Sequence, residues 1–172
     1  MITLRSLSRF FVLGMLGMAF GVETALAEKL DCTGTGKSKQ QISFQDIKPG
    51  DRPDHFLAQL VAIDSVSSKN PELDGAERKI YGHIDALAAY GSHSGYSTLT
   101  LKSGETLWDR YEGVGYTIGT FGVGDWEIRS QGVFQFVAGT GKYKAIRGGG
   151  YYSGRFTPAG GTVETLVCDA EY

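Results

Sequence analysis

The chain has 172 residues, of which 17 are basic and 19 acidic, so its formal net charge is −2 at neutral pH. This near balance excludes the basic footprint of a nucleic-acid-binding domain and argues against a polybasic segment that lies on a membrane surface. Aromatic residues make up 12% of the chain, which is too many for a disordered polypeptide. No linker or low-complexity tract divides residues 28–172, so we predict a single domain there.

Residues 1–27 have the pattern of a secretory signal peptide. Arg5 and Arg9 form a positive start, residues 10–22 are apolar and uncharged, and small residues precede Glu28. The apolar stretch is shorter than the ~20 residues that a membrane-spanning helix needs. We therefore predict cleavage before Glu28, export to the periplasm or the medium, and no stable membrane anchor. An uncleaved transmembrane anchor is the alternative.

The two cysteines lie close to the ends of the predicted mature chain, at Cys32 and Cys168. In an oxidising compartment, an even number of cysteines in a small exported domain favours a disulfide. The bond would join the first segment to the last, which suits a closed sheet whose terminal strands are neighbours. Two free, buried thiols are the alternative.

Most of the chain after residue 55 alternates polar and apolar side chains with a period of two, as β-strands do. Turns rich in glycine separate these stretches at the spacing typical of barrels. In chain order, the alternating stretches cover residues 56–66, 96–102, 107–117, 125–137, 145–156 and 162–170. The pattern predicts an all-β, antiparallel domain.

The segment at residues 76–90 is ambiguous between helix and strand. Residues 74–77 resemble a helix-capping box, and Ile80, Ile84 and Leu87 recur at helical spacing. As a strand, the same segment would place Ile80 and Ile84 on one face. Because the surrounding pattern is that of a sheet, we predict a strand over about residues 79–85 and keep the helix as the alternative.

The aromatic residues of the 125–137 strand suggest a ligand site. Trp126, Phe134 and Phe136 share one face with Ile128, and we expect this face to point inward because its burial is favourable. If the glycine-rich turn at residues 119–124 closes a symmetric hairpin, the preceding strand contributes charged and aromatic side chains to the same face. The predicted ligand-binding residues are Arg110, Glu112, Tyr116, Trp126, Phe134 and Phe136.

The register of this hairpin decides whether the charged residues belong to the site. Buried charges at Arg110 and Glu112 would mark a pocket, since such burial is unfavourable without pairing. The alternative is a one-residue slip, which would place both side chains on the surface and bring Asp109 and Tyr111 inward.

No constellation of residues predicts a particular catalytic or metal-dependent chemistry. His55, His83 and His93 match no strong metal-ligand spacing, and the G-x-S-x-G elbow of serine hydrolases does not occur. We therefore expect no metal and no cofactor, and we assign no catalytic residue.

Residues 95–156 carry a resemblance to a known group of proteins. Its first half runs from Gly95 through Trp108 to Gly113, and its second half contains Gly132–Phe136, the sequence GTGKY at residues 139–143 and the following glycines. Together they resemble small secreted bacterial proteins of unassigned function, which are similar to the barrel superfamily of allene oxide cyclases and dirigent proteins. The GTGKY stretch is the most specific part of the resemblance.

The resemblance implies an eight-stranded, antiparallel, calycin-like barrel that can include one short helix and has an interior large enough for a ligand. Dirigent proteins steer the coupling of radicals, and the cyclases fold a reactive epoxide toward ring closure. No functional residue of either group has a matching position here, so none is carried over. We expect the GTGKY glycines to form a tight turn that plugs one barrel end, with ligand contact as the alternative.

Three functions stay open at this point. The favoured one is a secreted barrel that binds a small, mostly apolar molecule in its interior. The second is a cofactor-free enzyme of the cyclase or isomerase kind, which acts by shape and one buried acid or base. The third is a ligand-free structural or interaction barrel with a filled interior. Oligomeric state is left open.

Overall fold

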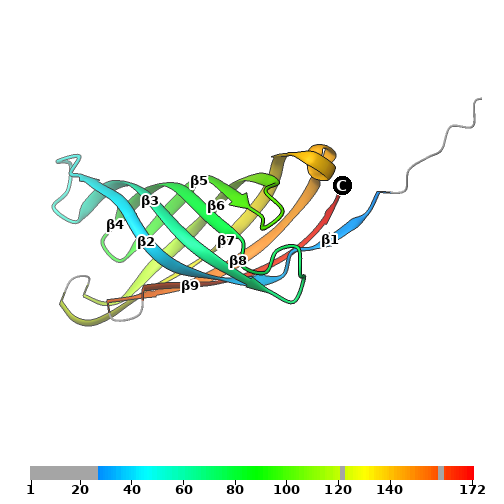
Figure 1. The fold of residues 1–172 in the computed structure, drawn as a ribbon. Helices are drawn as coiled ribbons and strands as arrows, with labels where there is room; N and C mark the ends of the chain where they lie inside the picture. Colours follow the sequence, from blue (N-terminus) through cyan, green and yellow to red (C-terminus); the bar gives the residue numbers. More distant parts are fainter. Residues whose placement is uncertain (1–26, 121–122, 159–160) are drawn as a thin grey trace, which may run out of the picture.

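A computed structural model describes residues 27–120, 123–158 and 161–172 (Figure 1). Apart from Ala27, the predicted signal peptide at residues 1–27 lies outside the described residues, and its cleavage stays a prediction. The described strands form a closed, eight-stranded antiparallel barrel with one short additional strand, which confirms the expected fold class. The described part of the chain contains no helix long and apolar enough to cross a membrane.

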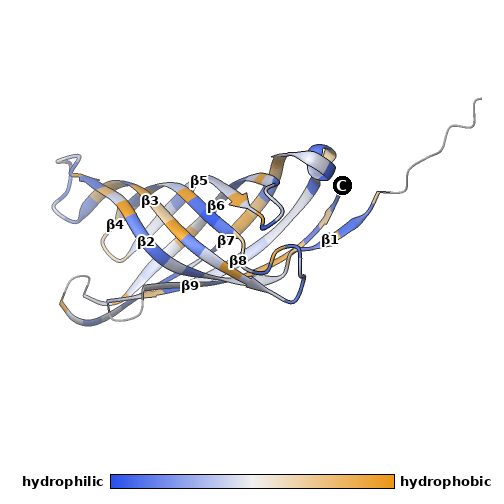
Figure 2. Ribbon diagram, in the orientation of Figure 1, coloured by the Kyte–Doolittle hydropathy of each residue, from blue (hydrophilic) through white to orange (hydrophobic). Residues whose placement is uncertain are grey.

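Consecutive strands of the barrel are neighbours, and the barrel closes where β9 pairs with β2 as well as with β8. The short β1 pairs with the end of β9, and a 3₁₀ turn, η1 (Gly141–Ala145), precedes β8. The strands are β1 (Lys29–Asp31), β2 (Gly34–Ile47), β3 (His55–Ser68), β4 (Glu77–Leu87), β5 (Tyr90–Thr100), β6 (Thr106–Thr120), β7 (Val123–Gly139), β8 (Arg147–Thr157) and β9 (Gly161–Glu171). Hydrophobic and hydrophilic residues alternate along several of them (Figure 2).

The ambiguous segment at residues 76–90 is a strand, β4, somewhat longer than the predicted 79–85. It pairs along its whole length with β3 on one side and β5 on the other, so its backbone groups have partners at both edges. A helix there would leave the edges of β3 and β5 unpaired inside the sheet, which is costlier than the modest local preference for helix. Tertiary pairing therefore decides the conformation.

One end of the barrel is closed by a hydrophobic core. The connections β3–β4, β5–β6 and β7–β8 lie at this end, together with β1 and the C terminus (Figure 1). Leu107 and Tyr143 are completely buried there. The core contains Leu30, Cys32, Val66, Leu73, Ala76, Leu99, Leu101, Leu107, Phe136, Tyr143, Ile146, Cys168 and Ala170.

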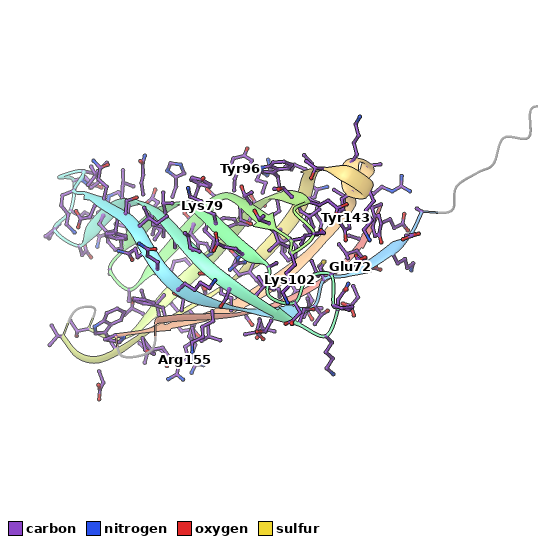
Figure 3. All side chains as sticks on the ribbon, in the orientation of Figure 1. Glu72, Lys79, Tyr96, Lys102, Tyr143 and Arg155 are labelled. Carbon is purple, nitrogen blue, oxygen red and sulfur yellow. A yellow bond between two sulfur atoms is a disulfide. The ribbon has the colours of Figure 1, made fainter. Side chains whose placement is uncertain are left out.

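The GTGKY stretch forms part of this closed end, as expected. Gly141 has a positive φ of 57°, and a Cβ on Gly139 would lie 2.3 Å from the carbonyl oxygen of Tyr143, so both positions favour glycine. The Tyr143 hydroxyl donates a hydrogen bond to Glu72, whose carboxylate also pairs with Lys142. Figure 3 shows Tyr143 and Glu72 near each other at this end.

The disulfide between Cys32 and Cys168 is present, which confirms the predicted pairing. It joins the segment before β2 to β9, with a Cα–Cα distance of 5.2 Å, and both cysteines are buried. Beside it, Glu28 and Tyr172 exchange two backbone hydrogen bonds of 3.0 and 2.9 Å. The first and last described strands are thus fastened together at the closed end.

Candidate functional site

The β6–β7 register differs from the symmetric hairpin and corrects part of the predicted site. Thr120 pairs with Val123, but Ile118 already pairs with Glu127, and the irregularity lies at the positive-φ glycine Gly119. Tyr116 therefore faces Arg129 and not Trp126. An irregularity of this kind moves every following side chain relative to its partner strand.

In this register, Arg110 and Glu112 lie on the outer face and are exposed, so the prediction that they point inward is wrong. Asp109 and Tyr111 point inward, as the alternative register required. The energetic reason is that the outer positions keep both charges in water. Asp109, which replaces them inside, has a hydrogen-bond partner there.

The other predicted site residues are divided between the two faces. Tyr116 is on the outer face and 44% exposed. Trp126 faces inward and packs on Phe156, with ring centroids 5.4 Å apart. Phe134 and Phe136 also face inward and meet edge to face, and Phe136 belongs to the closed-end core. Binding of a ligand by any of them stays a prediction.

An ion triad occupies the barrel interior. Nη2 of Arg78 on β4 donates a hydrogen bond of 2.7 Å to Oδ2 of Asp64 on β3, and it also bonds the carboxylate of Glu164 on β9. A Cβ on Gly36 would lie only 3.1 Å from this Nη2, so glycine leaves room for the guanidinium. Burial raises the pKa of Asp64, and Arg78 offsets part of that rise.

A second buried carboxyl group lies nearby on β6. Asp109 is 8% exposed and accepts a hydrogen bond from the hydroxyl of Ser97, which is also buried. Burial raises the pKa of Asp109 to about 6, although Ser97 and Arg78 act in the opposite direction. The side chain can therefore take up or release a proton close to neutral pH.

Three aromatic rings, His93 from β5, Tyr111 from β6 and Tyr152 from β8, form what we term the ring cluster. Their centroids are separated by 5.8 to 6.3 Å, and the two tyrosine rings meet edge to face. Nε2 of His93 and the Tyr152 hydroxyl share a hydrogen bond of 2.6 Å. Burial lowers the pKa of His93, which favours its neutral form, and raises the pKa of both tyrosines.

Glycines on neighbouring strands make space for the ring cluster. A Cβ on Gly113 or Gly132 would lie 2.5 or 2.4 Å from the Tyr152 hydroxyl oxygen, and one on Gly95 would lie 2.7 Å from that of Tyr111. Any larger residue would displace the tyrosines. Glycine is therefore favoured at these positions because its missing side chain leaves space for the two tyrosine hydroxyl groups.

Toward the end opposite the core, the large inward-facing side chains are apolar and partly exposed, while the small Ala58 and Ala86 are buried. This open end has partly exposed residues on its inner face, whereas Leu99 and Leu107 at the closed end are 8% and 0% exposed. The residues of the open end are Phe56, Ile84, Trp126, Ile128 and Phe156. The inward-facing side chains are thus apolar at the open end and polar farther in, where the ring cluster and the ion triad form what we term the polar floor.

The histidines have separate environments. His93 belongs to the ring cluster, whereas His83 is exposed on the outer face. His55 lies between Asp51 and Asp85, with nitrogen–oxygen distances of 2.7 and 3.0 Å. Among the described residues, no group of three or more His, Cys, Asp or Glu side chains is arranged to hold a metal ion.

The ion triad of Asp64, Arg78 and Glu164 was not among the residues predicted from the sequence. A signal was available, because Arg78 lies on the same alternating face as Ile80 and Ile84, where a surface charge is not expected. Asp64 and Glu164 are recognisable as inward-facing charges only when the pairing of β3 with β4 and of β9 with β2 is known.

No protein-family model matches the chain, and no curated protein matches it. The resemblance to the allene oxide cyclase and dirigent barrels therefore remains a prediction.

Proposed function

We propose that the barrel interior binds a small, mostly apolar molecule that enters through the open end and places a polar group on the ring cluster. The observation that carries this proposal is the contrast between the two ends. Large inward-facing apolar side chains such as Leu107 are buried at the closed end, whereas those at the open end are partly exposed and the small Ala58 and Ala86 are buried between them. Apolar surface left accessible inside a concave wall is typical of ligand sites.

The polar floor supports the same function. The imidazole of His93 and the hydroxyls of Tyr111 and Tyr152 offer donors and acceptors to a ligand group that reaches them. The ion triad lies in the same interior, and its electrostatic influence extends to both tyrosines. Buried ion pairs contribute little net stability compared with apolar residues of the same size, so a functional reason for retaining them is favoured.

Export is also part of this proposal. The Cys32–Cys168 disulfide is expected to persist in an oxidising compartment and to be rare in the cytosol. Together with the predicted signal peptide, it supports a site outside the cytoplasm. The ligand would then be a compound found in the periplasm or the medium.

The carboxyl group of Asp109 favours a second candidate, a cyclase- or isomerase-type enzyme. Its pKa of about 6 allows it to act as either an acid or a base near neutral pH. Tyr111 of the ring cluster is the next inward-facing residue on β6, and the charge of Asp109 raises its pKa further. In this case the bound molecule would be a substrate whose rearrangement needs one proton transfer.

Native mass spectrometry of the chain purified from the exported fraction of its own cells tests the binding proposal. We expect a bound small molecule that survives gentle ionisation. The neutral fluorophore N-phenyl-1-naphthylamine serves as a defined probe in parallel, because its fluorescence rises in apolar surroundings. Absence of both a co-purified molecule and a saturable fluorescence signal would refute interior binding.

A matched pair of variants on β4 locates the site. Ile84→Gln places a polar group on the inner face of the open end, whereas Leu87→Gln makes the same kind of change at an exposed outer position. We expect Ile84→Gln to weaken probe binding at least about fivefold, and Leu87→Gln to leave it unchanged. For the enzyme candidate, Asp109→Asn should abolish conversion of the co-purified molecule but retain its binding.

A further inference from the structure

The strands direct more acidic than basic side chains into the barrel interior. Asp64 on β3 and Glu164 on β9 both bond to Arg78 on β4. Asp109 on β6 accepts a hydrogen bond from Ser97 and has no basic partner of its own. Arg78 is the only buried lysine or arginine among the described residues. Because the triad sets two carboxylates against one guanidinium, it carries an excess negative charge at neutral pH, and ionised Asp109 adds to that excess.

This excess charge acts on the ring cluster. Burial is the largest cause of the raised pKa of Tyr111 and of Tyr152, and the charge of Glu164 raises both further. Arg78 opposes this effect of Glu164, but less strongly. At His93, burial lowers the pKa, and the charge of Glu164 acts in the upward direction. A negative charge that raises neighbouring pKa values stabilises positive charge at those positions, so the polar floor favours a cation over an anion.

The guanidinium of Arg78 does not provide a site for an anion. Its Nη2 already donates hydrogen bonds to the carboxylates of Asp64 and Glu164. Its Nε is buried and has no hydrogen-bond partner within the described residues, so one donor of the polar floor is unused. An uncharged ligand oxygen can accept from this Nε, whereas a carboxylate there is repelled by the two carboxylates that the same guanidinium holds.

The polar floor also offers the groups that recognise an ammonium ion. An ammonium donates three hydrogen bonds and accepts none, so it needs oxygen acceptors around it. The hydroxyl oxygens of Tyr111 and Tyr152 and the carboxylate of Glu164 are acceptors in this interior. Aromatic rings attract cations as well, and the centroids of the three rings of the cluster lie within 6.3 Å of one another.

We propose that the interior site selects hydrophobic amines, bound as ammonium ions, over alcohols of the same size, and that it rejects carboxylates such as fatty acids. The ammonium group compensates the excess negative charge of the polar floor, and the apolar part of the molecule lies at the open end. A carboxylate would increase the excess charge, and burial of a charge without an opposite partner is unfavourable. This selectivity rests on the proposed interior binding and specifies the polar group of the ligand.

Displacement of N-phenyl-1-naphthylamine by three probes of matched chain length tests the selectivity at neutral pH. The probes are decylammonium, 1-decanol and decanoate, each used below the concentration at which it forms micelles. We expect decylammonium to bind at least about tenfold more tightly than 1-decanol, and decanoate to bind at least about tenfold more weakly than 1-decanol. Equal affinities for the three probes, or a preference for decanoate, would overturn the proposal.

Glu164→Gln identifies the source of the selectivity. The amide keeps an oxygen that can accept from Arg78, and Asp64 still pairs with the guanidinium, but one negative charge is lost. We expect the decanoate dissociation constant, divided by that of decylammonium, to fall at least about tenfold. Glu112→Gln is the matched control because it removes the same charge from an exposed position on the outer face, and it should leave this ratio unchanged.

Asp109→Asn is the second variant if Glu164→Gln does not fold. It removes the other carboxylate of the interior, so the same ratio should fall at pH 8, where Asp109 of the wild type is ionised. An unchanged ratio in the interior variants, or an equal fall in Glu112→Gln, would contradict a selectivity set by the polar floor.

The neutral fluorophore separates the failure of this selectivity from the failure of interior binding. If N-phenyl-1-naphthylamine binds and all three probes displace it equally, the selectivity is refuted and interior binding stands. If the fluorophore does not bind the wild type and no probe binds, both are refuted.

Discussion

Asp109→Asn removes the negative charge of a buried carboxyl group whose pKa is raised to about 6. Asparagine has almost the same shape, and its side chain can still bond to the Ser97 hydroxyl. The substitution therefore isolates the effect of ionisation from that of packing. Because burial raises the pKa of Asp109, the folded state favours the protonated form, and ionisation destabilises the fold.

The sign and the size of the effect follow from the two pKa values. In the unfolded chain the carboxyl group ionises near its ordinary pKa of 3.8, and in the folded chain near 6. Below pH 4 both states are protonated and the stability contribution is fully present. As pH rises from 4 to 6 that contribution is lost, and the difference of roughly two pKa units corresponds to about 3 kcal/mol at most.

Urea denaturation of the wild type and Asp109→Asn from pH 4 to pH 8 measures this contribution. We expect the free energy of unfolding of the variant to gain about 2–3 kcal/mol relative to the wild type over this range, with most of the change below pH 6.5. A difference between the two proteins that stays constant with pH would refute the reasoning, because it would place Asp109 in contact with water. If Asp109 also transfers protons, the stabilised variant should be inactive, as expected where a functional group strains its surroundings.

Four further results are expected. Arg110→Ala and Glu112→Ala should each change the free energy of unfolding by less than about 0.5 kcal/mol, because both side chains are exposed; a loss above 2 kcal/mol would restore the inward register. Gly113→Ala should lower the free energy of unfolding by more than about 2 kcal/mol in urea titrations, since its Cβ would lie 2.3 Å from the Gln131 carbonyl oxygen. The Cβ of Gly115→Ala would lie 3.3 Å from its nearest neighbour, so this variant should lose less than half as much. Thiol titration of the denatured, non-reduced chain should detect no free thiol, and Cys32→Ser with Cys168→Ser should lower stability by about 2–5 kcal/mol. Arg78→Met should lower the free energy of unfolding by about 3–5 kcal/mol, because it leaves Asp64 and Glu164 buried without a cation. Adding Asp64→Asn and Glu164→Gln to the Arg78→Met variant should recover part of that loss in urea titrations.

The fold was largely predictable from local patterns. Alternation with a period of two indicated strands because adjacent side chains of a strand point to opposite faces, and this held from residue 96 onward with few exceptions. The end positions of Cys32 and Cys168 indicated the disulfide because a closed barrel brings its terminal strands together. The segment at residues 76–90 was decided by neighbouring strands, since its local signals favoured helix and strand almost equally.

The site required the tertiary structure. Alternation divides the residues of β6 into two faces but does not say which face is inside, and the irregularity at Gly119 reversed the expected answer for Arg110 and Glu112. The ion triad joins residues from three strands, and Arg78 and Glu164 have a sequence separation of 86, so no local pattern connects them. By itself, the sequence determined strands, turns and a covalent closure, because these depend on near neighbours or on chain ends. Which charged side chains are buried, and which of them pair with each other, was decided only by the closure of the barrel, because closure fixes the register of every strand at once.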